Sequence, residues 1–403
     1  MNDTHKALLI GLSSRILVVA VIVLCSVLFT VSSLQPATHQ TNPLPIVNLF
    51  NRFDSGYYIS IAQNGYPTGY PNISYWVGRY FNAYVPNPVL AKPDWAFFPL
   101  YPAATKAVSL LFTPLPVTDA IELAGFIVSN VAFFFSIYFF YKLTNKIFNL
   151  PQIALIATAF YSFFGGAVFY SAIYSEALFM ALALGAFYYL EEDKLSLAVL
   201  LGFLASFTRS DGLLICIPFL IYALQSLKNK SKTIKLLTAS ALVASPFLIF
   251  QLIGYEVAGG VFPITVIAHN LNFAIYPLLT TQLISISNSS VKTLAFYVIG
   301  LALIFLPTAY FISRLLPGSI KNSLIQDAKQ LKYWAFYASM IFVIIYQSNV
   351  YSTIRYAVPM LPIYWVSTII YTKNRLTGII IFAIMTGTFI IGAYMLETGG
   401  PFM

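Results

Sequence analysis

Apolar runs of near membrane-spanning length recur along the whole sequence, and they constrain its fold more than any other feature. A helix of roughly 20 residues crosses the hydrocarbon core of a bilayer. The first run is longer than the core of a signal peptide and has no A-x-A site after it, so it predicts an uncleaved span. The runs are Ile16–Leu34, Asp119–Tyr141, Ile153–Tyr170, Glu176–Leu190, Leu195–Phe207, Leu213–Leu227, Thr233–Gly254, Val291–Ile312, Tyr333–Gln347, Ala357–Tyr371 and Leu376–Leu396.

Composition and charge agree with a protein that lies mostly in lipid. Only 9% of the residues are charged, against about a quarter in soluble domains. The net charge of +9 does not indicate nucleic-acid binding, because the basic residues are spread along the chain. With the N-terminus in the cytoplasm, the positive-inside rule is satisfied and the C-terminus lies outside. Seven of the 22 lysines and arginines then fall outside: Arg52, Arg79, Lys92, Lys106, Arg209, Lys292 and Arg355.

The sequence predicts a single membrane domain, residues 1–403, whose longest early loop is residues 35–117. Within this loop the stretch Asn51–Pro102 holds the acids Asp54 and Asp94 among aromatic residues, glycines and prolines. Aromatic rings next to glycine and proline are typical of short helices at a membrane interface. We therefore expect this extracytoplasmic loop to form the floor of an active site.

The two acids of this stretch are candidates for chemistry, and each has a structural alternative. Asp54 precedes an expected short helix, Ser55–Asn64, so it suits an N-cap or a general base, and the two roles are compatible. Asp94 is either a loop acid paired with Lys92 or a second carboxylate that orients the acceptor or binds Mg²⁺ or Mn²⁺. The two acids would supply only part of the oxygen shell of such a cation, so metal binding stays open.

Other charged residues stand at the ends of later spans, on the same predicted side as Asp54 and Asp94. Glu176 is in the first turn of its span, where an acid complements the helix dipole. Arg209 ends one span and Asp211 begins the next, so capping explains this pair about as well as function does. Ionisable residues at the ends of buried spans mark function more often than loop residues do. Their gathering on one side predicts one site.

Arg355 is the hardest of these residues to explain by structure alone. It stands just before or within the first turn of the span Ala357–Tyr371, where a cation opposes the helix dipole. We expect it to meet an anion, and phosphate suits the planar fork of arginine. The sequence has no P-loop, G-x-G-x-x-G, HExxH or G-x-S-x-G motif. Chemistry on the outer side would therefore use a group activated on a lipid phosphate, close to Arg355 and Arg209.

Five segments carry a resemblance to a known family, and they occur in the family's order. They are "RFDSGYYISIAQNGYP", "AFFPLYP", "YSEALF", "TRSDGLL" and "RYAVPMLP". Together they resemble the PIG-V-like family of GPI mannosyltransferases and their prokaryotic relatives, within the GT-C glycosyltransferase superfamily. The chain departs from the family pattern at Phe53, where Trp is usual, at Asp211, where Asn is common, and at Asp94, which replaces an acid slightly farther upstream.

The apolar runs predict about eleven transmembrane helices, and the resemblance implies that they form an all-α GT-C-like bundle with an outward catalytic loop after the first span. It also implies a polyprenyl-phosphate sugar donor, usually of mannose, and inversion at the anomeric carbon. Carried onto this chain, it makes Asp54 the base, with Arg209 and Arg355 beside the donor phosphate and Asp94 and Glu176 orienting sugar or acceptor. The other expected substrate-binding residues are Arg52, Tyr57, Tyr66, Trp95, Phe98, Asp211 and Tyr356.

A second hypothesis is a non-catalytic transporter or flippase of a lipid-linked sugar. Such proteins usually carry charges near the bilayer midplane and show internal repeats, whereas the charges here gather at one predicted interface. The partners expected of the enzyme are the lipid-linked donor, a glycolipid or glycan acceptor, and the bilayer, without nucleic acid. Its site would face outward at a prokaryotic cell membrane or the ER lumen of a eukaryote.

Overall fold

The computed structural model describes residues 2–28, 45–68, 93–257, 262–264, 291–315, 324–346 and 353–398. Parts of the predicted loop, including residues 35–44 and 69–92, lie outside the described residues, as does Lys92. All regular structure in the described ranges is helical. The helices of eight or more residues are α1 (Asp3–Leu28), α3 (Ser55–Asn64), α5 (Leu100–Ser109), α6 (Val117–Phe148), α7 (Pro151–Ser162), α8 (Glu176–Glu191), α9 (Leu195–Ser206), α10 (Cys216–Gln225), α11 (Lys230–Val257), α14 (Val291–Leu315), α15 (Leu324–Tyr346), α17 (Leu361–Lys373) and α18 (Arg375–Thr398).

Short helices join these longer ones. They are α2 (Pro45–Asn48), α16 (Thr353–Tyr356) and the 3₁₀ helices η1 (Pro93–Ala96), η2 (Leu110–Phe112), η3 (Gly165–Tyr170) and η4 (Ser210–Ile215). The all-α class predicted from the sequence is confirmed, and each predicted apolar run overlaps a helix. Within the described ranges, 4 helices are long and apolar enough to cross a membrane, namely α1, α6, α11 and α18. The predicted number of eleven spans stays a prediction.

The first helix differs from the predicted span Ile16–Leu34. It begins at Asp3 and ends at Leu28, so Arg15 lies in the middle of α1 and not in a flanking cytoplasmic segment. Its side chain is buried, with the guanidinium carbon 4.1 Å from the centre of the Phe133 ring. The sequence prediction took this charged side chain as the boundary of the span, whereas the helix continues on both sides of it.

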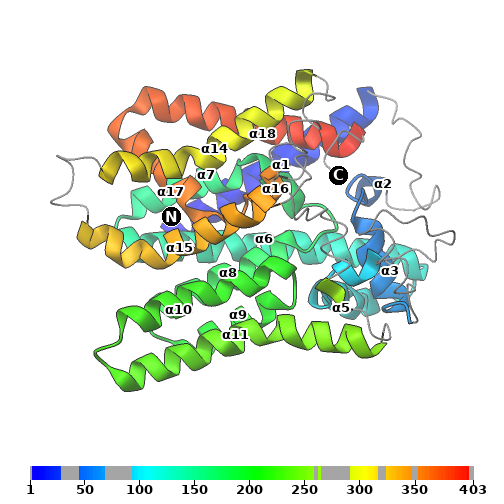
Figure 1. The fold of residues 1–403 in the computed structure, drawn as a ribbon. Helices are drawn as coiled ribbons and strands as arrows, with labels where there is room; N and C mark the ends of the chain where they lie inside the picture. The colour runs from blue at the N-terminus through cyan, green and yellow to red at the C-terminus, as the bar shows by residue number, and fades with distance from the viewer. Residues whose placement is uncertain are drawn as a thin grey trace, which may run out of the picture.

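The long helix α6 lies at the centre of the bundle. It packs against α1, α5, α7 and α8, and in Figure 1 α14 and α18 lie on one side of it while α9 and α11 lie on the other. The helix ends at Asn149, whose left-handed backbone (φ 53°) accommodates the turn. Pro151 then starts α7 at a position where its missing N–H costs nothing.

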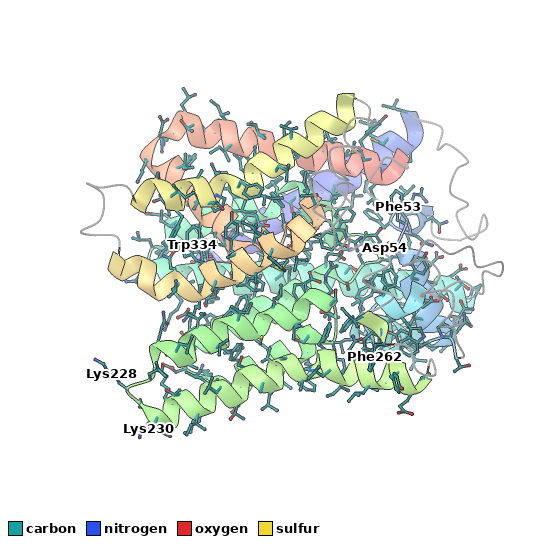
Figure 2. The ribbon with its side chains drawn as sticks, in the orientation of Figure 1. Phe53, Asp54, Lys228, Lys230, Phe262 and Trp334 are labelled. Carbon is teal, nitrogen blue, oxygen red and sulfur yellow. The ribbon has the colours of Figure 1, made fainter. Side chains whose placement is uncertain are left out.

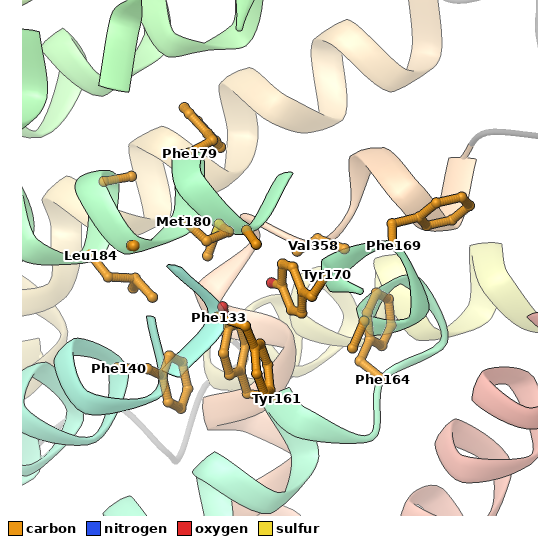
Figure 3. Packing of buried hydrophobic residues seen from close by; sticks show 14 of the residues in the cluster. Phe133, Phe140, Tyr161, Phe164, Phe169, Tyr170, Phe179, Met180, Leu184 and Val358 are labelled. Carbon is orange, nitrogen blue, oxygen red and sulfur yellow. The ribbon is translucent and has the colours of Figure 1, made fainter. Parts of the chain in front are cut away.

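Aromatic side chains fill the space between α6, α7, η3 and α17. Phe140 stacks on Tyr161 with their ring centres 4.5 Å apart, and the ring of Tyr364 meets both of them edge-on. Phe133 and Tyr170 continue this packing toward η3, as Figure 3 shows. Large buried rings of this kind contribute much of the packing energy of a core.

A glycine allows η3 to approach α16 closely. A Cβ on Gly166 would lie 2.6 Å from the carbonyl oxygen of Ile354, a backbone atom that cannot turn aside. Gly166 therefore permits η3 and α16 to touch, and this contact places Arg355 beside η3. In Figure 2, Asp54 lies at one end of the bundle and Lys228 and Lys230 lie at the other.

Candidate active site

Five charged side chains form a continuous chain of alternating sign at the end of the bundle that holds Asp54. The Asp54 carboxylate accepts a hydrogen bond from Nη1 of Arg355. Glu176 Oε1 accepts from Nε of Arg355 and from Nη1 of Arg209. Arg209 Nε in turn lies 3.3 Å from each carboxylate oxygen of Asp211. Segments up to 301 residues apart in the sequence thus meet in one site.

The chain of charges is buried at its centre and partly exposed at its Asp54 end. The side chain of Glu176 is 4% exposed and that of Arg355 is 8% exposed, whereas that of Asp54 is 29% exposed. Three carboxylates face two guanidinium groups. A buried charge is tolerated when it is paired and hydrogen-bonded, so each inner residue depends on its neighbours. A molecule arriving from outside would meet the Asp54 end first.

The geometry separates the two roles considered for Asp54. It is the residue before α3, but its side chain makes no capping hydrogen bond, and its carboxylate binds Arg355 instead. The preceding Phe53 has a left-handed backbone (φ 48°), which costs a non-glycine residue of order 1 kcal/mol or more. Capping therefore does not explain Asp54, and the strained turn directs its carboxylate toward the chain of charges.

Arg355 occupies a different element from the one expected. It lies in the single-turn helix α16 and α17 begins only at Leu361, so the argument from the dipole of the following span was wrong. The expectation that Arg355 meets an anion is fulfilled by Asp54 and Glu176 of this same chain. Its guanidinium carbon also lies 4.5 Å from the centre of the Tyr174 ring, a cation–π distance.

Tyr174 is a site residue that the sequence reasoning missed. Its hydroxyl donates to the carbonyl oxygen of Arg52 (3.1 Å) and accepts from the backbone N–H of Asp54 (3.2 Å). The next residue, Ser175, hydrogen-bonds the hydroxyl of Tyr58 in α3 at 2.7 Å. Tyr174 stands in the segment "YSEALF" that carried the resemblance, so its signal was present, although only the acid was selected from it.

Glu122 is a second missed residue. It is a buried acid of α6, and its Oε1 accepts a hydrogen bond of 2.9 Å from the amide nitrogen of Asn51. The Arg52 side chain binds the backbone carbonyl oxygens of Asn48 and Asn51. Arg52 and Glu122 thus hold the loop that carries Asp54. Glu122 lay inside an apolar run, where an isolated acid gave no motif.

Asp94 lies in η1, within electrostatic reach of the aromatic residues of α3. Burial, and then the charges of Asp54 and Asp94, raise the pKa of Tyr57. Burial, followed by the influence of Tyr58 and Asp94, raises the pKa of Tyr66 well above its ordinary value. The charges of both candidate acids, Asp54 and Asp94, therefore act on Tyr57. A role of Asp94 in the chemistry stays a prediction.

The other aromatic candidates pack on one another. Tyr66 stacks on Trp95 with ring centres 4.4 Å apart, and Trp95 and Phe98 both contact Phe250 of α11. Trp95 and Phe98 are 4% and 1% exposed, so in this conformation they fix η1 against α11. Their role as walls of a sugar site stays a prediction. Tyr356 does reach the site, with its ring 5.7 Å from the guanidinium carbon of Arg209.

The donor set is small for a hard metal ion. Within the described residues, no group of three or more His, Cys, Asp or Glu side chains could hold a metal. Mg²⁺ and Ca²⁺ prefer about six or more oxygen ligands, and the carboxylate of Asp54 is already engaged by Arg355. These residues do not fit Mg²⁺ or Mn²⁺ as they stand.

The fold and this site define a class, the integral membrane proteins that carry a buried chain of acids and arginines at one end of a helical bundle. The sequence profile of the Mannosyltransferase (PIG-V) family matches residues 13–259, more than half of the chain. The chain belongs to this family. It is 27% identical over 196 residues to GPI mannosyltransferase 2 of Schizosaccharomyces pombe, a match that covers 45% of this chain and 41% of that protein.

Structures of the oligosaccharyltransferase of the archaeon Archaeoglobus fulgidus are among the solved structures to which this chain is similar. The oligosaccharyltransferase of Archaeoglobus fulgidus in its apo form has a TM-score of 0.48 at 12% identity, covering 97% of this chain and 56% of that one. The oligosaccharyltransferase AglB from the same organism, in complex with an inhibitory peptide and a dolichol-phosphate, has a TM-score of 0.45 at 13% identity, covering 96% and 55%.

Proposed function

We propose that this protein is an inverting glycosyltransferase that moves a sugar, mannose, from a polyprenyl-phosphate donor to a hydroxyl group of a glycolipid or glycan. The observation that carries the proposal is the pairing of Asp54 with Arg355. It puts a carboxylate suited to proton abstraction next to a guanidinium suited to phosphate. Membership of the mannosyltransferase family supports mannose as the sugar.

The reaction assigns one role to each half of this pair. The acceptor oxygen attacks the anomeric carbon from the face opposite the phosphate, and Asp54 takes the hydroxyl proton. The bond between the anomeric carbon and the phosphate oxygen breaks, and its electron pair stays on that oxygen. The phosphodiester monoanion thereby becomes a phosphomonoester dianion. Arg355 and Arg209 stabilise the charge that develops on this leaving group.

The proposed site faces the extracytoplasmic side of the membrane. The ion pairs of Lys146, Lys232 and Lys332 with residues 191–193 gather these lysines at one end of the bundle, and Asp54 lies at the other (Figure 2). An excess of lysine and arginine marks the cytoplasmic side. A lipid-linked donor fits this arrangement, because its head group would lie at the membrane interface and would bring the sugar to the site.

The experiment is sugar transfer by the purified protein with a panel of polyprenyl-phosphate sugars and glycolipid acceptors. We expect the mannosyl donor to give product with inverted anomeric configuration. Asp54→Asn should lower the transfer rate by about 100-fold or more, as loss of a general base implies, while the protein stays folded in detergent. Asp94→Asn is the matched variant, and it reports whether the second acid takes part.

Two outcomes would contradict the proposal. Transfer by Asp54→Asn at the wild-type rate would remove this residue from the role of base. Movement of the lipid-linked sugar across vesicle membranes, without any glycan product, would favour the non-catalytic transporter. The charge placement argues against the transporter, because the ion chain begins at Asp54, which lies at one end of the bundle.

A further inference from the structure

The two roles proposed for Asp54 and Arg355 exclude each other while their side chains are paired. A carboxylate that accepts a hydrogen bond from a guanidinium is a poorer proton acceptor than a free one. The same guanidinium nitrogen cannot serve a phosphate oxygen without sharing or releasing Asp54. The structure therefore holds the proposed base, Asp54, in contact with the arginine proposed to bind the phosphate, Arg355.

The contacts of Arg355 decide which of its two bonds can be exchanged. Nε binds Glu176, whose side chain is 4% exposed, and Nη1 binds Asp54, whose side chain is 29% exposed. The inner bond is closed to a ligand, and a second arginine, Arg209, binds the same Glu176 oxygen. Arg355 is thus anchored at Nε, and an incoming anion meets its outer nitrogens from the side of Asp54.

The net charge of the chain also indicates that an incoming phosphate displaces a carboxylate. The chain of three carboxylates and two arginines already carries a net negative charge when all five are ionised. A phosphodiester adds another negative charge, which is costly in a buried site unless a carboxylate withdraws. Asp54 is the most exposed carboxylate of the chain, and Arg355 is its one arginine partner there. Asp54 is therefore the carboxylate that can leave its arginine when a phosphate binds.

We propose that Arg355 exchanges Asp54 for the donor phosphate, so that donor binding releases the base. The exchange rests on the proposed function and specifies how the site is regulated. Glu176 is a positioning residue that holds the guanidinium at Nε throughout. As transfer proceeds, Asp54 loses its negative charge to the acceptor proton while the phosphate gains one. Arg355 is already paired with the phosphate at this stage, so it stabilises the negative charge that the leaving group gains, and the net charge of the site stays constant.

The test follows from the competition between the two anions. If Asp54 occupies the phosphate position, its neutral analogue should bind a phosphate lipid more tightly. We expect Asp54→Asn to bind farnesyl phosphate at least about fivefold more tightly than the wild-type protein, although this variant transfers sugar about 100-fold or more slowly. Binding would be measured by calorimetry on the full chain in detergent at constant salt. A wild-type-like or weaker affinity would overturn the exchange.

A matched variant separates exchange from a general change of charge. Asp211→Asn also removes one carboxylate from the chain, but Asp211 binds Arg209 and not Arg355 in the chain of contacts. We expect it to gain clearly less affinity than Asp54→Asn. Equal gains in the two variants would show that net charge alone is responsible and would overturn the proposal. In the double variant with Arg355→Gln, the gain from Asp54→Asn should vanish.

The failure of this inference is distinguishable from the failure of the proposed function. Wild-type protein that transfers sugar, together with an Asp54→Asn variant that gains no affinity, rejects the exchange alone. An Asp54→Asn variant that gains affinity, together with wild-type protein that forms no product from any donor, keeps the exchange of anions at Arg355 and rejects glycosyl transfer.

Discussion

The two ends of the bundle both gather acids and bases, but they do so in different ways. At one end, Arg209 and Arg355 join three carboxylates in a chain whose arginines are at most 9% exposed. At the other end, each of the three consecutive acids at residues 191–193 pairs with its own lysine. Of those lysines, Lys146 and Lys232 are 47% and 38% exposed, and Lys332 is buried.

The difference teaches what each set of charges is for. Exposed ion pairs contribute between zero and about 1 kcal/mol, which is enough to orient helix ends and no more. Buried charges cost several kcal/mol each to desolvate, so a connected chain of five of them indicates function more strongly than the exposed pairs do. Arginine suits such a site because its fork binds two partners at once, as Arg355 binds Asp54 and Glu176.

The largest effect is expected from breaking the buried chain. Arg209→Met should lower the free energy of unfolding by about 3–5 kcal/mol, because it leaves Glu176 and Asp211 buried without their shared partner. Denaturant titration in detergent measures this loss. The matched change at the other end, Lys146→Met, removes a half-exposed lysine and should cost under about 1 kcal/mol. Similar losses in both variants would erase the contrast between the two ends.

The next effect concerns the position of Arg355 and not its charge. In Gly166→Ala the added methyl group would meet the carbonyl oxygen of Ile354, so α16 must move away from η3. A displacement of about 1 Å can cost about 100-fold in rate, and we expect sugar transfer to fall by roughly 10- to 100-fold. Gly387→Ala in α18 is the control, since a Cβ there meets nothing within 4 Å. Unaltered transfer in Gly166→Ala would show that the contact is adjustable.

Much of the fold could be predicted from the sequence, because apolar runs report directly on helices in lipid. The end of the bundle shared by Asp54, Glu176 and Arg355 followed from the parity of spans and the placement of basic residues. Other features could not be predicted, and three of them show the physical reasons. Arg15 reads as a flanking charge because hydropathy does not register a ring such as Phe133 beneath it.

The other two misses arise at the site. Tyr174 acts through its hydroxyl and its ring face, and although it stands in the segment "YSEALF", nothing about the residue itself distinguishes it among the 28 tyrosines of the chain. The left-handed backbone at Phe53 could not be predicted either. Glycine or asparagine would indicate such a turn, but the sequence has a bulky phenylalanine at this position. Tertiary contacts decide both.

Arg15 gives a third case, a buried arginine to which no acid is paired in the described part of the chain. Its Nη1 donates to Ser171 (3.0 Å), and its Nη2 has no hydrogen-bond partner there. Arg15→Met removes a costly buried charge together with a cation–π contact to Phe133, and these effects oppose each other. We expect the free energy of unfolding to change by under about 1 kcal/mol. A loss as large as that of Arg209→Met would show that burial, and not the acid partners, sets the cost.

The smallest effect is expected from Asp193 at the lysine end. The hydrogen bond from Lys232 lowers the pKa of Asp193, so the folded protein favours the ionised carboxylate. The resulting stability is present above the unfolded pKa of about 4, and it is lost as the pH falls through the lowered folded value. Asp193→Asn keeps a residue that tolerates the left-handed backbone found there (φ 54°).

Because Asp193 is exposed, this variant should lower the unfolding free energy by under about 1 kcal/mol at pH 7. Unfolding would be measured for both proteins from pH 7 downward, and the difference should shrink as the pH falls below about 4. A difference that does not shrink with falling pH would mean that Asp193 stabilises the turn through its shape and not its charge. The lysine end would then depend on local geometry, as the site end does at Gly166.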